Sequence, residues 1–302
     1  SAVLSKAYSE TPDNAEIFFL GNHVQTSGAA IRRWEHNSDK DKAGYLDLMY
    51  KLKLDGGSVF DFSVGGMYRD KKRDSFFNEY TFNSATGVKD PQYQGEDWNN
   101  YDEILFTPLK YGNISDPLNY DATEKIGAGY GMVKYTYQKW EFIAGVRVEH
   151  TNQGYTLKFP TENTDPEGYQ KYTDVLPSFH AKYGVHKNAN LRFSYARSIN
   201  RPSFFEIVPY SIINEDYKEK GNPDLKHTVA DNLDLRYEFF PKSSEQFMVG
   251  MFYKKLKNPI EYGLLNEGQD TYYKPMNFGN ATNLGVEVDV MKYFNWFGIK
   301  AN

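Results

Sequence analysis

The sequence predicts an all-β protein, an antiparallel up-and-down transmembrane β-barrel, and three observations carry this prediction. Apolar and polar residues alternate along many segments, which is the pattern of strands with one apolar face. Short turns alternate with long polar stretches. Aromatic residues gather beside the short turns. Tight turns at one membrane surface and long loops at the other are typical of such a barrel.

The composition supports a barrel over a soluble domain. The 302 residues include 17% aromatic residues, yet the mean hydropathy is −0.69. A soluble protein so rich in aromatic side chains would have a higher mean hydropathy. A membrane barrel combines an apolar, aromatic lipid face with a polar lumen and long polar loops, so it accounts for both values.

Charge and cysteine content exclude several classes of protein. The net charge of −5 is small and mixed along the chain, so no basic footprint indicates a nucleic-acid partner. The absence of cysteine excludes disulfide frameworks and thiolate metal sites. No run of about 18 apolar residues predicts a transmembrane helix. The start at Ser1 shows no secretion leader, so we expect a fragment or a trimmed chain.

Alternation is clearest in five segments, namely 45–54, 59–69, 140–149, 232–239 and 284–290. In 140–149, for example, one face carries Trp140, Phe142, Ala144, Val146 and Val148, and the other carries Glu141, Arg147 and Glu149. Several segments have the length of about 9–11 residues that a tilted strand needs to cross a bilayer. Their charges fall on one face, where a wet lumen tolerates them.

The turns give the number of strands. Short connections are expected near 55–58, 138–139, 186–190, 240–245 and 295–296, and long polar stretches at 83–122, 158–172, 203–227 and 262–279. This order predicts about ten to twelve strands in one domain over residues 1–302. No segment has the period of a helix, and no linker indicates a second domain.

Aromatic residues flank three of the short turns. They are Tyr135, Tyr137 and Trp140 at the first, Tyr237, Phe239 and Phe240 at the second, and Tyr293, Phe294, Trp296 and Phe297 at the third. Amphipathic rings prefer the membrane interface. The sequence therefore predicts an aromatic girdle at the periplasmic rim.

Residues 195–261 carry a recognisable string of motifs. It contains Arg201-Pro202-Ser203, then Gly221-Asn222-Pro223-Asp224-Leu225, and then Tyr253-Lys254-Lys255 followed by Pro259-Ile260. In this order and spacing the string resembles the barrel of TonB-dependent outer-membrane receptors, particularly those of Bacteroides-like bacteria. The segments 144–149, 284–287 and 65–73 also resemble strands of that family, so the resemblance covers nearly the whole chain.

The resemblance implies a barrel of about 22 strands with a plug inside it. This chain would be an internal part of that barrel, without the plug, the energy-coupling box or the closing C-terminal strand. The implied location is the cell outer membrane. The implied partners are outer-membrane lipid, the TonB complex acting through the missing plug, a small-molecule or oligosaccharide ligand, and in some cases a surface lipoprotein.

Two long loops supply the candidate ligand contacts. Loop 83–122 contains Tyr93, Asp97, Trp98 and Tyr101, and loop 203–227 contains Tyr210 and Tyr217. Aromatic rings beside hydrogen-bonding groups suit stacking on a sugar or an aromatic siderophore. The alternative is that these rings pack the loops against themselves or their neighbours.

Five charged residues are expected to face the lumen, namely Arg147, Glu149, Arg197, Arg201 and Arg236. The resemblance implies that Arg197 and Arg201 contact the plug. Ion pairing within the barrel wall is an equally good explanation of these two arginines.

Other candidate sites favour a structural explanation. Residues 39–44 begin like a calcium loop, but Tyr50 stands where a bidentate Glu is needed. Residues 127–131 are glycine-rich but lie within a strand pattern and not between a strand and a helix. The six histidines have no metal-ligand spacing. We expect no cofactor, no metal and no catalytic site.

The function that the resemblance implies is energy-coupled import of a siderophore, cobalamin or oligosaccharide across the outer membrane. Two alternatives stay open. One is a passive porin or an adhesin-type barrel without energy coupling. The other is an outer-membrane enzyme, which would need a Ser/His or paired-acid site at the lumen or rim.

Overall fold

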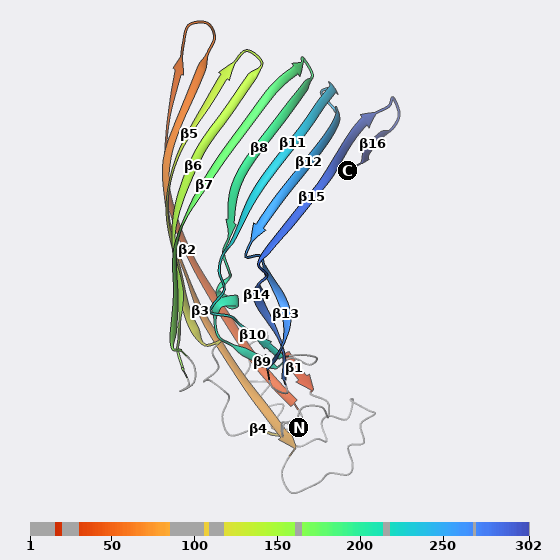
Figure 1. Cartoon of the computed structure of the whole chain (residues 1–302). Helices are drawn as coiled ribbons and strands as arrows, with labels where there is room; N and C mark the ends of the chain where they lie inside the picture. Colours follow the sequence, from red (N-terminus) through yellow and green to blue (C-terminus); the bar gives the residue numbers. More distant parts are fainter. Residues whose placement is uncertain are drawn as a thin grey trace.

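The computed structural model describes residues 16–19, 30–84, 106–108, 118–160, 165–213, 218–267 and 270–301. Within these residues the chain forms one large curved sheet of 12 strands and one small sheet of four strands (Figure 1). All pairs in the large sheet are antiparallel, and its main strands are neighbours in chain order apart from the excursions into the small sheet. The prediction of an all-β, antiparallel, up-and-down architecture is confirmed.

The large sheet is an open wall within the described residues. Its strands follow in the order β1 (Glu16–Phe19), β2 (Ala30–Lys53), β3 (Val59–Ser84), β5 (Tyr120–Tyr137), β6 (Trp140–Leu157), β7 (Glu167–His186), β8 (Ala189–Asn200), β11 (Thr228–Lys242), β12 (Glu245–Lys257), β15 (Asn280–Tyr293) and β16 (Gly298–Ala301), with β4 (Phe106–Pro108) paired to β3.

Several strands are longer than the alternating segments that predict them. β2 has 24 residues and β3 has 26, whereas about 9–11 residues suffice to cross a bilayer. Much of the additional length, as in 35–42 and 69–75, is polar on both faces, so no apolar period reveals these residues in the sequence. They remain strands because cross-strand hydrogen bonds pair the backbone whatever the side chains are.

The short turns lie together at one end of the wall, the upper end in Figure 1. They fall between β2 and β3, β5 and β6, β7 and β8, β11 and β12, and β15 and β16. All five predicted short connections are therefore confirmed. In the first turn, Gly56 and Gly57 both have φ near 85°, a conformation that only glycine adopts without strain.

The opposite end carries the small sheet and a short helix (Figure 1). The elements are α2 (Phe204–Ile207), β9 (Ser211–Ile213), β10 (Lys218–Lys220), β13 (Ile260–Glu267) and β14 (Asp270–Asn277), and the small sheet has the order β13-β14-β10-β9. The described parts of 201–227 and 258–279 are called the cap below.

The cap differs from the sequence prediction. The stretches 203–227 and 262–279 were expected as polar loops, and no helix was expected. β10 and β14 instead pair in parallel although they come from separate connections, a contact that local alternation cannot reveal. The stretch 158–172 is also shorter than expected, because β7 already begins at Glu167.

The wall has two chemically different faces. The register places Trp140, Phe142, Ala144 and Val146 on one face of β6, and Glu141, Arg147 and Glu149 on the other. We call the face that the cap covers the inner face, and the opposite one the outer face. Exposed large apolar side chains on the outer face include Leu46, Leu48, Tyr50, Val64, Val146, Val148, Val175, Leu235, Met251, Leu284, Val286 and Val288.

Aromatic rings form contacts across the outer face near the short turns. Tyr135 stacks with Phe60 at 4.6 Å between centroids, and Trp140 contacts Tyr183 on β7 at 4.4 Å. Phe142 continues the row to Phe179 at 6.4 Å. These contacts lie where the sequence predicts the girdle. No helix among the described residues is long and apolar enough to cross a membrane.

Candidate functional site

The candidate site is the inner face of the wall together with the cap that lies against it. The chain leaves β8 at Asn200 and turns at Pro202 into α2. Ser203 caps this helix, because its side chain accepts from the backbone of Glu206 while the Glu206 side chain accepts from the backbone of Ser203 at 2.6 Å. This capping box fixes the direction in which the cap begins.

The cap buries a compact apolar cluster against the inner face. From the cap come Phe204, Ile207, Val208, Tyr210 and Leu225, and from the wall or its margin come Phe77, Leu118, Tyr120, Ala122, Tyr155 and Leu157. Phe77 lies on β3, whereas the cap begins after β8. The cap therefore reaches across β7, β6 and β5 along the inner face.

Polar contacts next to this cluster fix the cap to β6 of the wall. Arg201 donates to the carboxylate of Glu149, and its Nε donates to the hydroxyl of Thr151 at 3.1 Å. Arg147 donates to the same carboxylate at 2.5 Å. Glu149 has a side-chain exposure of only 11%, and charge-assisted hydrogen bonds offset the cost of burying such a group.

Further contacts join the cap to β6 and β7. Gln153 donates to the carbonyl of Pro202 at 2.7 Å, and Gln170 donates to the carbonyls of Pro223 and Leu225 at 2.9 and 2.7 Å. These bonds tie the backbone carbonyls of the cap to side chains of β6 and β7.

His227 makes a third attachment where the cap returns to β11. Its Nε2 lies 2.9 Å from the Asp174 carboxylate, and its ring stacks on Tyr172 at 4.0 Å between centroids. Both partners belong to β7, so the cap is held by β7 at this end as well as by β6 at Arg201.

The two halves of the cap hold each other through side-chain amides. Asn222 donates to the carbonyl of Pro275, and Asn277 donates to the carbonyls of Lys226 and Asn258 while accepting from the Lys226 backbone N–H. The motif Gly221-Asn222-Pro223 therefore joins 201–227 to the β13–β14 hairpin.

Gly221 lies in a place with no room for a side chain. A Cβ at this position would lie 1.7 Å from the carbonyl oxygen of Val208, far inside van der Waals contact, and 2.9 Å from the ring of Tyr210. The close approach of the two backbones, and not a turn with positive φ, requires glycine here.

Tyr210 lies inside the cap. It is 1% exposed, and its hydroxyl donates to the Glu219 carboxylate at 2.6 Å. Burial, together with this hydrogen bond, raises the pKa of Tyr210 well above its usual range. Burial and the carboxylates of Glu206 and Glu219 also raise the pKa of Tyr262 to about 12. Both phenols therefore stay neutral at pH values near 10, where an exposed tyrosine ionises.

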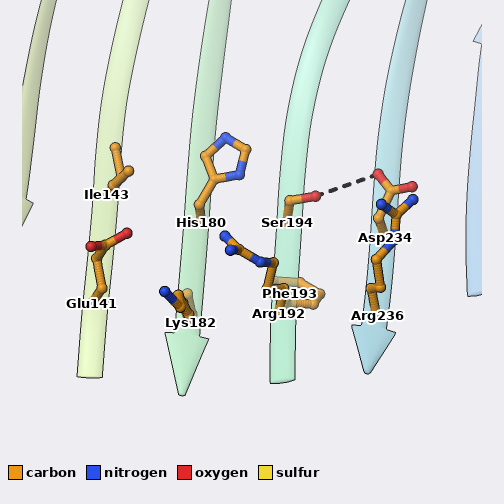
Figure 2. Close-up of a pocket in the computed structure, with 10 residues that line it drawn as sticks. Glu141, Ile143, His180, Lys182, Arg192, Phe193, Ser194, Asp234 and Arg236 are labelled. Atoms are coloured by element: carbon orange, nitrogen blue, oxygen red, sulfur yellow. Dashed lines mark hydrogen bonds between the residues drawn. The ribbon is translucent and has the colours of Figure 1, made fainter. Parts of the chain in front are cut away.

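A second feature of the inner face is a charged hollow nearer the short turns, shown in Figure 2. Its volume is about 460 Å³, and β6, β7, β8 and β11 line it with Glu141, Ile143, His180, Ala181, Lys182, Arg192, Phe193, Ser194, Asp234 and Arg236. Ala181 and Phe193 pair with each other and belong to the outer face by register. Cations and acids both line the hollow, so it can hold water and polar groups.

The charges of the hollow are partly paired. Arg192 donates to Glu238 at 2.7 Å, and Ser194 donates to Asp234 at 3.4 Å (Figure 2 draws the second contact). Gly250 lies between Arg236 and Glu287 in the register, and Arg236 Nη2 lies 3.6 Å from Glu287 Oε2. Lys182 makes no ion pair within the described part of the chain.

The structure places the predicted site residues as follows. Tyr93, Asp97, Trp98, Tyr101 and Tyr217 lie outside the described residues. Tyr210 is a buried cap residue, so its contact with a ligand stays a prediction. Arg147, Glu149 and Arg201 come together under the cap, and Arg236 lies apart from them in the hollow.

Arg197 requires a correction, because it was expected to face the lumen. The register pairs Phe179 with Tyr195 and Arg197 with Asp231, which puts Arg197 on the outer face. Its guanidinium makes two hydrogen bonds to Asp231, at 2.9 and 3.2 Å, and Tyr195 donates to the same carboxylate. On β8 the paired charge lies between Tyr195 and Ile199 on this face.

Sequence reasoning missed Lys182 and Arg192 in the hollow, and it missed the glutamine and histidine anchors of the cap. Arg192 and Ser194 alternate with Leu191, Phe193 and Tyr195, so the signal for this inner face was present in the sequence. Gln153 and Gln170 carry no such signal, since their partners are backbone carbonyls of the cap. Among the described residues, no group of three or more His, Asp or Glu side chains is placed to hold a metal ion.

Comparison with known proteins identifies a family. A model described as an outer membrane protein beta-barrel family matches residues 5–302. No curated protein matches the chain.

Solved structures share the fold. The chain is similar to the ferric citrate transporter FecA in its unliganded form, with 12% identity, 89% of this chain and 34% of that chain covered, and a TM-score of 0.58. It is also similar to the siderophore receptor PiuA from Acinetobacter baumannii, with 14% identity, 87% of this chain and 36% of that chain covered, and a TM-score of 0.57. A third similar structure is the ferric-catecholate import receptor Fiu from K12 E. coli, with 12% identity, 92% of this chain and 40% of that chain covered, and a TM-score of 0.52.

These identities show similarity of fold alone. The chain spans little more than a third of each of the three solved chains. Their names describe transporters and receptors, and the wall described above corresponds to part of each.

Proposed function

Because the chain belongs to the outer membrane protein beta-barrel family, we propose that it forms part of the wall and of the ligand-side surface of an outer-membrane nutrient import receptor. The protein lies in the cell outer membrane. The proposed import is energy-coupled through the TonB complex, and the proposed ligand is a siderophore, cobalamin or an oligosaccharide.

The single observation that carries the proposal is the cap held across the inner face. A passive pore needs an open aqueous path, whereas this cap covers the wall from β8 to β3 and is fixed by Arg201, Gln153 and His227. Rigidly supported loops at the mouth of a barrel are suited to ligand capture, since binding then orders few additional residues. The likeness of the wall to named import receptors supports the same function.

The inner face supplies the second part of the proposal. Arg236 and the charged hollow, together with Arg147 and Glu149 under the cap, would line the passage and contact a plug that gates it. In this proposal, a plug would transmit the force exerted by the TonB complex to the ligand-binding side of the barrel. The mixed charges of the hollow suit a polar, movable contact better than a dry apolar interface.

The ligand contacts are proposed for loop 83–122, with Trp98 and Tyr101 as the main stacking residues beside Tyr93 and Asp97 in the sequence, and for Tyr217 on the stretch 203–227. The test substitutes Trp98 and Tyr101 together with alanine in the intact protein. The control substitutes Tyr293 and Trp296, which are 51% and 87% exposed at the short-turn end. Affinity is measured against ferric siderophores, cobalamin and oligosaccharides.

We expect at least a tenfold loss of affinity for one ligand class in the loop variant and none in the control. Unchanged affinity and uptake in the loop variant would sink the loop assignment. Uptake that continues after collapse of the proton-motive force would instead favour a passive porin. Turnover of a ligand by the purified protein would favour the enzyme alternative.

A further inference from the structure

The outer face carries a row of lysines beyond its apolar residues. Lys42 on β2, Lys125 on β5 and Lys171 on β7 lie in one register row with Asp70 and Asn152. The next row outward pairs Lys40 on β2 directly with Lys72 on β3. We call Lys40, Lys42, Lys72, Lys125 and Lys171 the lysine strip.

The strip begins where the membrane-facing surface ends. Leu46, Val148 and Val175 belong to the last aliphatic row, and the next row contains Tyr68 and His150. The lysines of the first strip row follow two residues later, about 7 Å further along the strands. This is the long-loop end of the wall, where a barrel in the outer membrane would meet the headgroups of the outer leaflet.

The charge of the strip is largely uncompensated. All five lysines are exposed, and none makes an ion pair within the described part of the chain. One acid, Asp70, lies among them. The row further out holds three acids: Asp74 and Asp121 lie 2.8 and 3.8 Å from Lys158, and Glu167 lies on β7 at the end of this row. Directly opposed like charges such as Lys40 and Lys72 are destabilising unless an anion lies between them.

The inner face of the same strands shows the contrast. There Arg69 pairs with Asp41, and Arg73 pairs with Asp39 at 2.7 Å. Lys71 also lies 3.7 Å from Asp39. Cations of β3 therefore find protein partners on the inner face, whereas those of the outer strip do not.

We propose that the lysine strip binds the phosphate groups of the glycolipid in the outer leaflet. It extends from β2 to β7, four strand spacings or about 19 Å, which is wide enough for more than one phosphate. Its lysines reach the headgroups on flexible stems, and Asn152 and His150 add hydrogen-bonding groups to the same surface. The acyl chains of the lipid would lie on the aliphatic rows below.

The test measures lipid binding to the intact protein in detergent by native mass spectrometry, with purified lipid A as the probe. Its dephosphorylated form is the second probe. The strip variant is Lys42→Gln/Lys72→Gln/Lys125→Gln. The matched control, Lys53→Gln/Lys139→Gln/Lys187→Gln, removes the same charge at the short-turn end.

The wild type and the control are expected to bind phosphorylated lipid A more tightly than the dephosphorylated form. Each lysine removed from the strip weakens binding about fivefold, since one basic residue near an anionic lipid surface contributes about 1 kcal/mol. Wild-type binding also weakens as salt is raised, a readout that needs no variant.

Three results would overturn the proposal: equal affinity for both forms of the lipid, equal loss in the strip variant and the control, or wild-type binding that does not respond to salt. If the strip variant loses an anionic protein partner from the cell surface but keeps lipid A, the strip is a protein-docking surface and the lipid proposal fails.

Discussion

Arg201 and Glu149 are 52 residues apart in the sequence, and their side chains form an ion pair on the inner face of the wall. Arg201 lies at the first residue of the cap, and Glu149 lies on β6, two strands away across β7. The pair therefore fixes where the cap starts relative to the wall it covers.

Replacing Glu149 with glutamine is expected to loosen the cap. It leaves Arg147 and Arg201 without their shared carboxylate, and charge-assisted hydrogen bonds of this kind contribute about 1.5–3 kcal/mol each. Hydrogen exchange of the amides in 203–227 should speed up by at least tenfold. Glu287→Gln, on an exposed acid that only approaches Arg236, serves as the control. Unchanged protection of the cap in Glu149→Gln would show that the pair does not anchor it.

Gly65 is expected to tolerate no side chain. An added Cβ would lie 2.3 Å from Asp47 Oδ1 and 2.5 Å from Tyr130 Cε1. The Tyr130 ring crosses Gly65 to donate its hydroxyl to Asp47 at 2.6 Å, so it cannot move without losing that bond. Overpacking of this kind costs about 1–3 kcal/mol.

The comparison variant is Gly131→Ala, since Gly131 has open space around its Cβ position. Denaturant unfolding in detergent should show a lower midpoint for Gly65→Ala than for Gly131→Ala. Equal midpoints would mean that the Tyr130 ring is not held over Gly65.

Tyr210→Phe is expected to destabilise the cap by about 1–3 kcal/mol, because Glu219 loses a buried donor. Tyr169, which is 56% exposed and makes only long hydroxyl contacts, provides the control. Cap stability is measured by hydrogen exchange across 218–226. A cap as well protected in Tyr210→Phe as in the wild type would contradict the assigned hydrogen bond.

The same tyrosine predicts a pH dependence. Its pKa is raised in the folded cap above the ordinary value of 10.0, so its contribution is fully present below pH 10. As the pH rises past that value, the unfolded segment ionises while the folded one does not, and cap stability falls. The fall should be shallower in Tyr210→Phe. Identical pH profiles for the two proteins would contradict the burial of this phenol.

The wall could be predicted from the sequence because its two faces meet different surroundings. β6 and β11 alternate along most of their length: Val146 and Leu235 lie on the outer face, and Arg147 and Arg236 lie on the inner one. The short turns and the girdle follow from the same local pattern.

The cap could not be predicted in this way. Its β10–β14 pairing joins Lys218 to Tyr272 across two separate connections, and its anchors are amides that bind backbone carbonyls. Neither feature leaves a period in the sequence. Loop 83–122, which holds Trp98 and Tyr101, lies largely outside the described residues.

Arg197 shows that the presence of a charge in a strand does not by itself decide which face of the wall carries it. A Lys or Arg facing lipid costs about 2–4 kcal/mol at mid-membrane, which favoured a lumen position. On the outer face the Asp231 carboxylate pairs with Arg197 at 2.9 Å, and Tyr195 donates a hydrogen bond to the same carboxylate. The ion pair with Asp231, which alternation alone does not reveal, accounts for this arginine on the outer face.

The central claim is that the wall presents one face to lipid and the other to the passage. The chain has no cysteine, so single cysteines can be placed at Leu233, Asp234, Leu235 and Arg236 on β11, each carrying a fluorescent label in the membrane-embedded protein. The account predicts strong quenching by brominated lipid at 233 and 235 and little at 234 and 236. Equal quenching at all four positions, or the opposite alternation, would contradict it.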